Sequence, residues 1–370
     1  MSFVIGRGEE SPKGFAGHLG RYRALDGSEG AELYLDLDGP HAMLVVGKRG
    51  YGKSFTLGVI AEELARSDGV APVIVDPMGV FDTLSGRSQG ETSIDEWRVP
   101  DVEPVPATVV EAPAVTATAL DPQSWCALLA LSPESGPGSL VWRAAERAET
   151  IEGMCEHVQT VNAPEADRRS AINHLHLAES WNVFDPDGLD AEDLAGPEVT
   201  ILDVSGHPNA PMNAVCRGVA EALYRARVRG TIDRLPWLLI DEAHTFFDGV
   251  AGPALRTILT RGRAPGVSLV SATQRPSAVP PVGISQSDVL ISHRLTSEAD
   301  IDALERAKPT YMNESLAERM PTEPGEVIVV DDATETIHAA QVRLRDTPHG
   351  GDSPRASTVV EDRRLADRHQ

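Results

Sequence analysis

A glycine-rich loop between an apolar run and a helix-like segment constrains the fold of this 370-residue chain most strongly. Residues 42–46 read AMLVV, residues 47–54 read GKRGYGKS, and residues 54–66 have the composition of a helix. The loop fits the pattern G-x-x-x-x-G-K-S/T in the strand–loop–helix context that the pattern requires. Its glycines let successive backbone N–H groups point at phosphate oxygens, and the start of the helix adds partial positive charge. The loop therefore predicts a nucleotide-binding site.

Individual roles follow from the chemistry of the side chains in this loop. Lys53 is expected to bridge the β- and γ-phosphate oxygens as a catalytic cation, and the Ser54 hydroxyl is expected to hold Mg²⁺. Only four of the 33 basic residues are lysines, so a lysine at position 53 adds weight to the motif. We expect nine consecutive residues to bind the nucleotide, namely Gly47, Lys48, Arg49, Gly50, Tyr51, Gly52, Lys53, Ser54 and Phe55.

A second apolar run, at residues 237–240, ends in the paired acids Asp241 and Glu242. A buried strand would deliver Asp241 to the carboxyl edge of the sheet, where it can help to hold Mg²⁺. Glu242 can then polarise a water molecule for in-line attack on the γ-phosphate. This pair favours hydrolysis coupled to work over a small-molecule kinase, which needs no catalytic glutamate there. Asp76 and Asp203 also end apolar runs, and each could line the nucleotide edge of the sheet or cap a turn.

Polar residues after the next apolar run, at residues 267–272, add candidates for the reaction. Gln274 can hydrogen-bond the γ-phosphate or the attacking water and so sense hydrolysis. Arg261 and Arg263 lie at the end of a helix-like segment, and Arg275 follows Gln274. The planar guanidinium suits transition-state charge, and an arginine supplied across a subunit interface would make hydrolysis depend on assembly. The alternative is that Arg261 and Arg263 only satisfy carbonyl groups at the helix end.

Further apolar runs alternate with helix-like segments along the chain. The runs span residues 73–75, 199–204 and 326–330, with weaker candidates at 32–37 and 107–110. The helices are expected over residues 54–66, 213–228, 253–263 and 297–306. This alternation predicts an α/β fold with a mostly parallel sheet that is covered by helices on both faces.

Residues 121–185, which lie between the apolar runs at 73–75 and 199–204, are mostly helix-like and open with Asp121-Pro122 as an N-cap and first turn. We interpret this region as a helical insertion. The end of the chain is charged and aperiodic, which predicts a disordered tail. The expected division is a short N-terminal segment (1–40), the two parts of the core (41–120 and 196–345), the helical insertion (121–195) and the tail (346–370).

The amino-acid composition indicates the salt conditions and the cellular compartment in which we expect the chain to work. With 33 basic and 56 acidic residues the formal charge is 33 − 56 = −23, which together with scarce lysine favours a halophilic protein adapted to molar salt. A GC-rich genome would also replace lysine by arginine, but it would not by itself add acidic residues. No run of 18 apolar residues and no hydrophobic leader occurs, so we expect a cytoplasmic protein without membrane insertion. Salt screening leaves a nucleic-acid partner possible despite the negative charge.

In combination, five segments resemble the HerA–FtsK superfamily of ring-forming motor ATPases, and the HerA branch most closely. They read HAMLVVGKRGYGKSFTLGVIAEEL, VIVDPMGVF, WLLIDEAH, GRAPGVSLVSATQRP and PGEVIVV. The resemblance implies a RecA-like P-loop NTPase core that hydrolyses ATP with Mg²⁺, with Arg263 as the likeliest finger supplied in trans. Members of the family work as hexamers that translocate or unwind double-stranded DNA, often with the NurA nuclease.

Departures from the family leave alternatives open. Only 46 residues precede Gly47, so we expect residues 1–40 to be at most a remnant of the family's N-terminal β-barrel, on which nucleases usually dock. A conjugation or type IV secretion ATPase shares every motif and differs in its partner. A third hypothesis is a nucleotide-dependent assembly switch that translocates nothing. The trans finger stays open among Arg261, Arg263 and Arg275.

Overall fold

The computed structural model describes residues 3–7, 15–24, 27–86, 105–307 and 315–350. Within this part of the chain, twelve strands form one sheet in the order β1-β3-β2-β12-β11-β10-β4-β9-β8-β5-β7-β6. The strands are β1 (Phe3–Ile5), β2 (Ala16–Arg23), β3 (Glu29–Asp36), β4 (Ala42–Val46), β5 (Val70–Asp76), β6 (Ala107–Val110), β7 (Val199–Asp203), β8 (Leu235–Ile240), β9 (Ser268–Thr273), β10 (Val289–Ser292), β11 (Glu326–Asp331) and β12 (Thr336–Val342).

Helices connect these strands and cover the sheet. They are α1 (Lys53–Ala65), α2 (Pro122–Leu128), α3 (Gly136–Ala145), α4 (Ile151–Thr160), α5 (Glu165–Glu179), α6 (Asn209–Arg229), α7 (His244–Phe247), α8 (Gly252–Arg261), α9 (Pro281–Ser285), α10 (Glu298–Ala307) and α11 (Leu316–Arg319). Single 3₁₀ turns lie at Asp82–Ser85, Ala117–Ala119 and Pro276–Ala278. None of the helices in the described ranges is long and apolar enough to cross a membrane.

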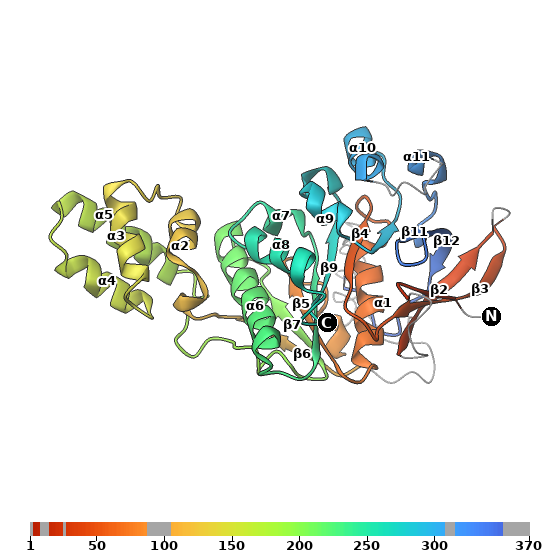
Figure 1. Cartoon of the computed structure of the whole chain (residues 1–370), viewed down its shortest axis with the longest axis horizontal. Helices are drawn as coiled ribbons and strands as arrows, with labels where there is room; N and C mark the ends of the chain where they lie inside the picture. Colours follow the sequence, from red (N-terminus) through yellow and green to blue (C-terminus); the bar gives the residue numbers. More distant parts are fainter. Residues whose placement is uncertain (1–2, 8–14, 25–26, 87–104, 308–314, 351–370) are drawn as a thin grey trace, which may run out of the picture.

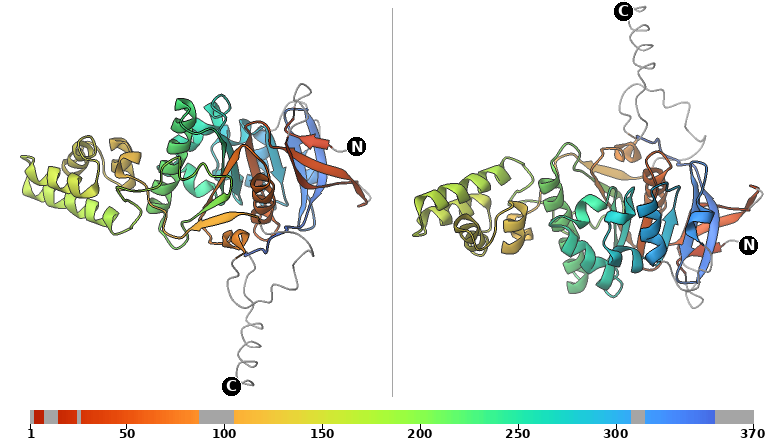
Figure 2. Two further views of the ribbon diagram at one scale, coloured as in Figure 1. Left: turned by 90° about the horizontal axis from the view of Figure 1, so that it is seen from below. Right: turned by 90° about the horizontal axis from the view of Figure 1, so that it is seen from above.

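The seven strands from β10 to β6 in the sheet order are parallel to one another. Side chains that alternate along β4 enter two different cores: Leu44 packs with α6, α8 and α10, whereas Met43 packs with α1. Both faces are therefore buried, which explains why these strands are continuously apolar in sequence. Figure 2 shows helices on both sides of the sheet. The predicted α/β fold, with a mostly parallel sheet and helices on both faces, is confirmed.

The first three strands extend this sheet instead of closing a barrel of their own. β2 pairs antiparallel with β12, and the antiparallel β12, β11 and β10 connect it to the parallel core. The sequence suggested a strand or two in residues 1–40, at residues 32–37, and the described part of this segment holds three, β1, β2 and β3. The structure also has β10 and β12, for which we expected no strand, because β10 has four residues and β12 mixes polar and apolar side chains.

Helices α2–α5 stand at one end of the molecule, opposite β1–β3 (Figure 1). They enclose a hydrophobic cluster of their own around Trp125 and Leu175. Local capping defines their starts: the side chains of Asp121, Ser135 and Thr150 accept backbone N–H bonds at the first turns of α2, α3 and α4.

The end of the described chain differs from the expected disordered tail. Thr347 is 6% exposed, and its backbone N–H and hydroxyl both donate to Glu62 of α1. Residues 346–350 therefore pack on the fold, because α1 presents a buried carboxylate to them. The remainder of the expected tail, residues 351–370, lies outside the described residues.

Candidate nucleotide-binding site

The phosphate loop joins β4 to α1, and its backbone geometry explains its glycines. Gly50 and Gly52 have φ angles of 81° and 109°, in the left-handed region that side chains disfavour. At Gly47, a Cβ atom would come within 2.5 Å of the Cβ of His293, so the loop has no room for a larger residue. Helix α1 then starts at Lys53, and its first turn places unpaired N–H groups beside the loop.

Lys53, Ser54 and Asp241 meet where β4 and β8 end. The Ser54 hydroxyl donates to Oδ2 of Asp241 at 2.6 Å, although the two residues are 187 positions apart in sequence. Lys53 is 6% exposed and Asp241 is 1% exposed. Burial lowers the pKa of Lys53, while the charges of Glu242 and Asp241 oppose this shift. A hydroxyl and a carboxylate held side by side are hard oxygen donors, so this pair fits a magnesium ion.

Glu242 follows Asp241 in a strained conformation. Its φ is +47°, which is rare for a residue with a side chain, and such strain concentrates at active sites. Its backbone N–H donates to Oδ1 of Asp241 at 2.8 Å. Its buried Oε2 makes no hydrogen bond within the described ranges, and Nδ1 of His244 lies 3.4 Å from it. Burial, followed by the charge of Asp241, raises the pKa of Glu242, so this carboxylate is suited to accept a proton.

These groups line one pocket of about 670 Å³, which also includes Gln274 at the end of β9. The ends of β8 and β9 are tied together by the N–H of Ala243, which donates to the carbonyl of Ala272 at 2.8 Å. The predicted residues that line the pocket are Arg49, Gly50, Gly52, Lys53, Ser54, Phe55, Asp241, Glu242 and Gln274. Gly47, Lys48 and Tyr51 do not line it: Gly47 packs on His293, and the Lys48 ammonium lies 4.8 Å from the centre of the Tyr51 ring.

Part of the chain matches a known protein family. Residues 18–118 match the family model described as helicase HerA, central domain. The resemblance to the HerA–FtsK superfamily is confirmed. No curated protein sequence matches the chain.

Solved structures of P-loop ATPases share the fold of this chain. VirB4 of Thermoanaerobacter pseudethanolicus is similar with a TM-score of 0.63 at 15% identity, over 89% of this chain and 96% of that one. The bacterial conjugative coupling protein TrwB, in a form called TrwBdeltaN70, gives 0.56 at 14% identity over 94% and 97%. The plasmid coupling protein TrwB in complex with ADP and Mg²⁺ gives 0.54 at 14% identity over 84% and 87%.

The three arginine candidates lie outside the pocket. Arg261 ends α8, Arg263 lies in the turn that follows, and Arg275 follows Gln274; all three side chains are exposed. None of them is among the residues that line the described pocket. A role in trans for Arg263 stays a prediction, since a single chain has no neighbouring subunit.

Asp76 and Asp203, the two other aspartates that end strands, are turn residues. Asp76 is 1% exposed and accepts backbone N–H bonds from Met78, Gly79 and Phe81 at 2.9–3.0 Å. Burial raises the pKa of Asp76 to about 6, against these hydrogen bonds. Asp203 accepts from the N–H of Ser205 in the same way. Neither lines the pocket, so each shapes the loop after its strand.

Two histidines at this site were missed by the sequence analysis. His293 is fully buried behind the phosphate loop, with Nε2 2.9 Å from the hydroxyl of Thr56. Burial and the charge of Lys53 lower the pKa of His293 to about 3, so the loop rests on a neutral imidazole. His244 lines the pocket, and its Nδ1 lies 3.1 Å from the hydroxyl of Thr273. His293 follows β10, the short strand that the sequence did not reveal, whereas His244 stands within the quoted segment WLLIDEAH.

Proposed function

We propose that this chain hydrolyses ATP with Mg²⁺ and uses that energy as a ring motor which translocates or unwinds double-stranded DNA. The observation that carries the proposal is the convergence of Lys53, Asp241 and Glu242 in one pocket at the ends of β4 and β8. The match to the HerA central domain supports the motor class. The structure of TrwB with ADP and Mg²⁺ supports nucleotide and magnesium binding on a similar fold.

The residues divide the chemistry among them. Lys53 and the N–H groups of the loop bind the phosphates and offset their charge. Ser54 and Asp241 would hold Mg²⁺, which supplies charge neutralisation on the phosphate oxygens when it is bound. Glu242 orients a water molecule and accepts its proton, for which its raised pKa is suited. Gln274 contacts the γ-phosphate or the attacking water from the end of β9.

Assembly would complete the site. A homohexamer would place the exposed Arg263 of one subunit at the pocket of the next, where its guanidinium stabilises the transition state. Hydrolysis would then depend on the ring, and DNA would pass through its centre in the cytoplasm, with a NurA-like nuclease as a further partner.

Two other functions fit the same site. A conjugation or type IV secretion ATPase is supported by the likeness to VirB4 and to the conjugative coupling protein TrwB. A nucleotide-dependent assembly switch would hydrolyse slowly and translocate nothing.

The deciding experiment measures ATP hydrolysis in molar KCl with and without double-stranded DNA. Lys53→Ala should abolish turnover, whereas Arg229→Ala, an exposed basic residue in the last turn of α6, should not. Strong stimulation by DNA, together with strand displacement, supports the motor. Turnover that depends on Lys53 but ignores DNA favours the secretion ATPase or the switch. Light scattering during size-exclusion chromatography, with and without nucleotide, tests the hexamer.

A further inference from the structure

One wall of the pocket has no role in the chemistry described above. We call it the distal wall; it consists of Pro324, Gly325, Gln341, Val342, Leu344 and His349, all of which line the pocket. Most of these residues belong to the segments around β11 and β12. In the sheet, β11 and β12 lie on one side of β4, and β8 with its catalytic acids lies on the other.

The orientation of a bound nucleotide follows from this arrangement and rests on the proposed function. Hydrolysis requires the γ-phosphate to face Glu242, while Lys53 holds the β- and γ-phosphates. The α-phosphate, the ribose and the base must then extend from the loop away from β8. The distal wall lies in that direction and adjoins the loop, because the N–H of Gly325 donates to the carbonyl of Tyr51 at 3.3 Å.

The chemistry of the distal wall suits an aromatic base. Leu344 is 72% exposed although it lines the pocket, which is unusual for a large apolar side chain at the edge of a cavity. His349 packs edge-on against the ring of Phe55 in the first turn of α1, with ring centres 5.5 Å apart. Apolar and aromatic surface with a few polar groups, here the Gln341 amide and the imidazole, is typical of sites for flat heterocycles.

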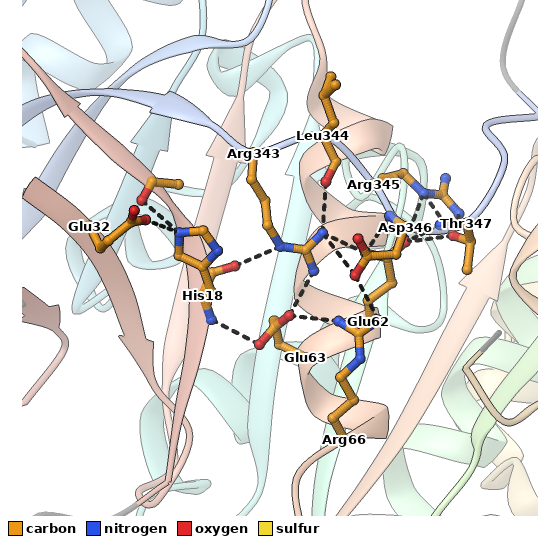
Figure 3. A network of polar contacts seen from close by, with 11 residues as sticks. His18, Glu32, Glu62, Glu63, Arg66, Arg343, Leu344, Arg345, Asp346 and Thr347 are labelled. Atoms are coloured by element: carbon orange, nitrogen blue, oxygen red, sulfur yellow. Dashed lines mark hydrogen bonds and ion pairs between the residues drawn. The ribbon is translucent and has the colours of Figure 1, made fainter. Parts of the chain in front are cut away.

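Buried ion pairs fix the distal wall on α1. Figure 3 shows Arg343 and Arg345 on either side of Leu344. Arg343 reaches the carboxylates of Glu62, Glu63 and Asp346, and the Arg345 guanidinium lies beside Thr347. Arg343 donates to Glu62 at 2.8 Å and to Glu63 at 2.7 Å. The contact with α1 is close, because a Cβ at Gly58 would lie 2.7 Å from the Arg345 guanidinium.

The two neighbours of Leu344 explain its placement. Arg343 and Arg345 are 12% and 1% exposed and pair with the Glu62 carboxylate of α1, whereas Leu344 between them is 72% exposed. The buried side chain of Arg345 also reaches Nδ1 of His349 at 3.2 Å. An imidazole that accepts at Nδ1 carries its proton on Nε2, so this contact sets the tautomer of His349.

We infer that the distal wall is the base subsite of the nucleotide, with Leu344 packed against the face of the base. The phosphate loop would then bind the phosphates alone, and the distal wall would distinguish a nucleotide from inorganic polyphosphate. The affinity contributed by Leu344 would come from burying its exposed side chain.

The test compares the binding of ADP with that of inorganic pyrophosphate, since neither ligand is hydrolysed through attack on a γ-phosphate. Calorimetric titrations use the full-length chain, Leu344→Ala, and Leu177→Ala as the matched control; Leu177 is 51% exposed on α5. Leu344→Ala should weaken ADP binding by about tenfold, which corresponds to about 1.4 kcal/mol, and leave pyrophosphate binding unchanged. Leu177→Ala should change neither.

Each other outcome overturns the inference in a recognisable way. If Leu344→Ala binds ADP as the unmodified chain does, the base lies elsewhere and the proposed function stands. Equal weakening of both ligands shows that Leu344 supports the loop and not the base. If the unmodified chain binds neither ligand, the proposed function fails as well. The same holds if Lys53→Ala binds both ligands as tightly as the unmodified chain does.

Discussion

Glu62 in the middle of α1 offers the sharpest test of how the fold is held together. Its side chain is fully buried, and its carboxylate accepts hydrogen bonds from groups in residues 343–347. The donors are the Arg343 guanidinium (2.8 Å), the Asp346 N–H (3.2 Å), and the N–H and hydroxyl of Thr347 (2.9 and 2.6 Å). Glu62→Ala removes the carboxylate and leaves the buried Arg345 side chain, 1% exposed, without its counter-charge.

The expected loss of unfolding free energy is large for a single substitution. Removing one partner of a buried ion pair costs about 3–5 kcal/mol, because the remaining charge stays desolvated. Domains have free energies of unfolding of about 5–15 kcal/mol. A domain in the middle of this range, at about 10 kcal/mol, would lose about a third or more of its stability. The measurement is urea unfolding followed by circular dichroism.

Glu29→Ala is the matched control, because Glu29 pairs with Arg21 at 2.9 Å on the surface, where the side chains are 64% and 50% exposed. Because solvent screens such a pair, it contributes little to stability, and this variant should unfold at the same urea concentration as the unmodified chain. A loss of less than about 1 kcal/mol for Glu62→Ala would refute the reasoning, since it would mean that Arg343 and Arg345 find water or other partners at no cost.

The other predictions concern pH, catalysis, metal and salt. Burial lowers the pKa of His41, but Asp288 and Asp36 outweigh it and raise the pKa to about 9. The protonated His41 therefore adds about 3 kcal/mol to the free energy of unfolding below its ordinary pKa of 6.5, and this contribution is lost as pH rises through 9. Urea unfolding at a series of pH values should show this loss in the unmodified chain and not in His41→Asn. Glu242→Gln should lower turnover roughly 10²- to 10⁴-fold while ADP still binds; intact hydrolysis would disprove the catalytic assignment. Ser54→Ala should raise the Mg²⁺ concentration for half-maximal hydrolysis at least about tenfold, measured by metal titration of turnover. Dialysis from molar to low salt should unfold the chain by circular dichroism, and full activity in dilute buffer would exclude the halophilic interpretation.

Sequence patterns predicted the parallel core because its signals are local. The strand at residues 42–46 coincides with β4, and the glycine-rich loop leads into α1 as expected. Asp121 caps α2 as its position before a proline suggested. Such features depend on a few neighbouring residues, so the chain shows them without its fold.

The other parts of the site depend on contacts between distant residues. The bond from Ser54 to Asp241 spans 187 positions, and the one from Thr347 to Glu62 spans 285. β12 mixes polar and apolar residues, and in sequence it resembles a loop because only its place between β11 and β2 gives it partners. The distal wall was therefore missed, as was the histidine behind the phosphate loop.

The phosphate loop, its acidic partner motif and the α/β class could be predicted from the sequence, since glycines, charges and apolar runs specify them locally. The folded chain makes Asp76 and Asp203 turn residues while Asp241 faces Lys53. It also brings His349, from the expected tail, to the wall of the pocket beside residues of the expected core. The physical reason is that burial and pairing are long-range: a carboxylate becomes a turn cap, a metal ligand or the anchor of a distant segment according to which groups the folded chain brings within hydrogen-bonding distance.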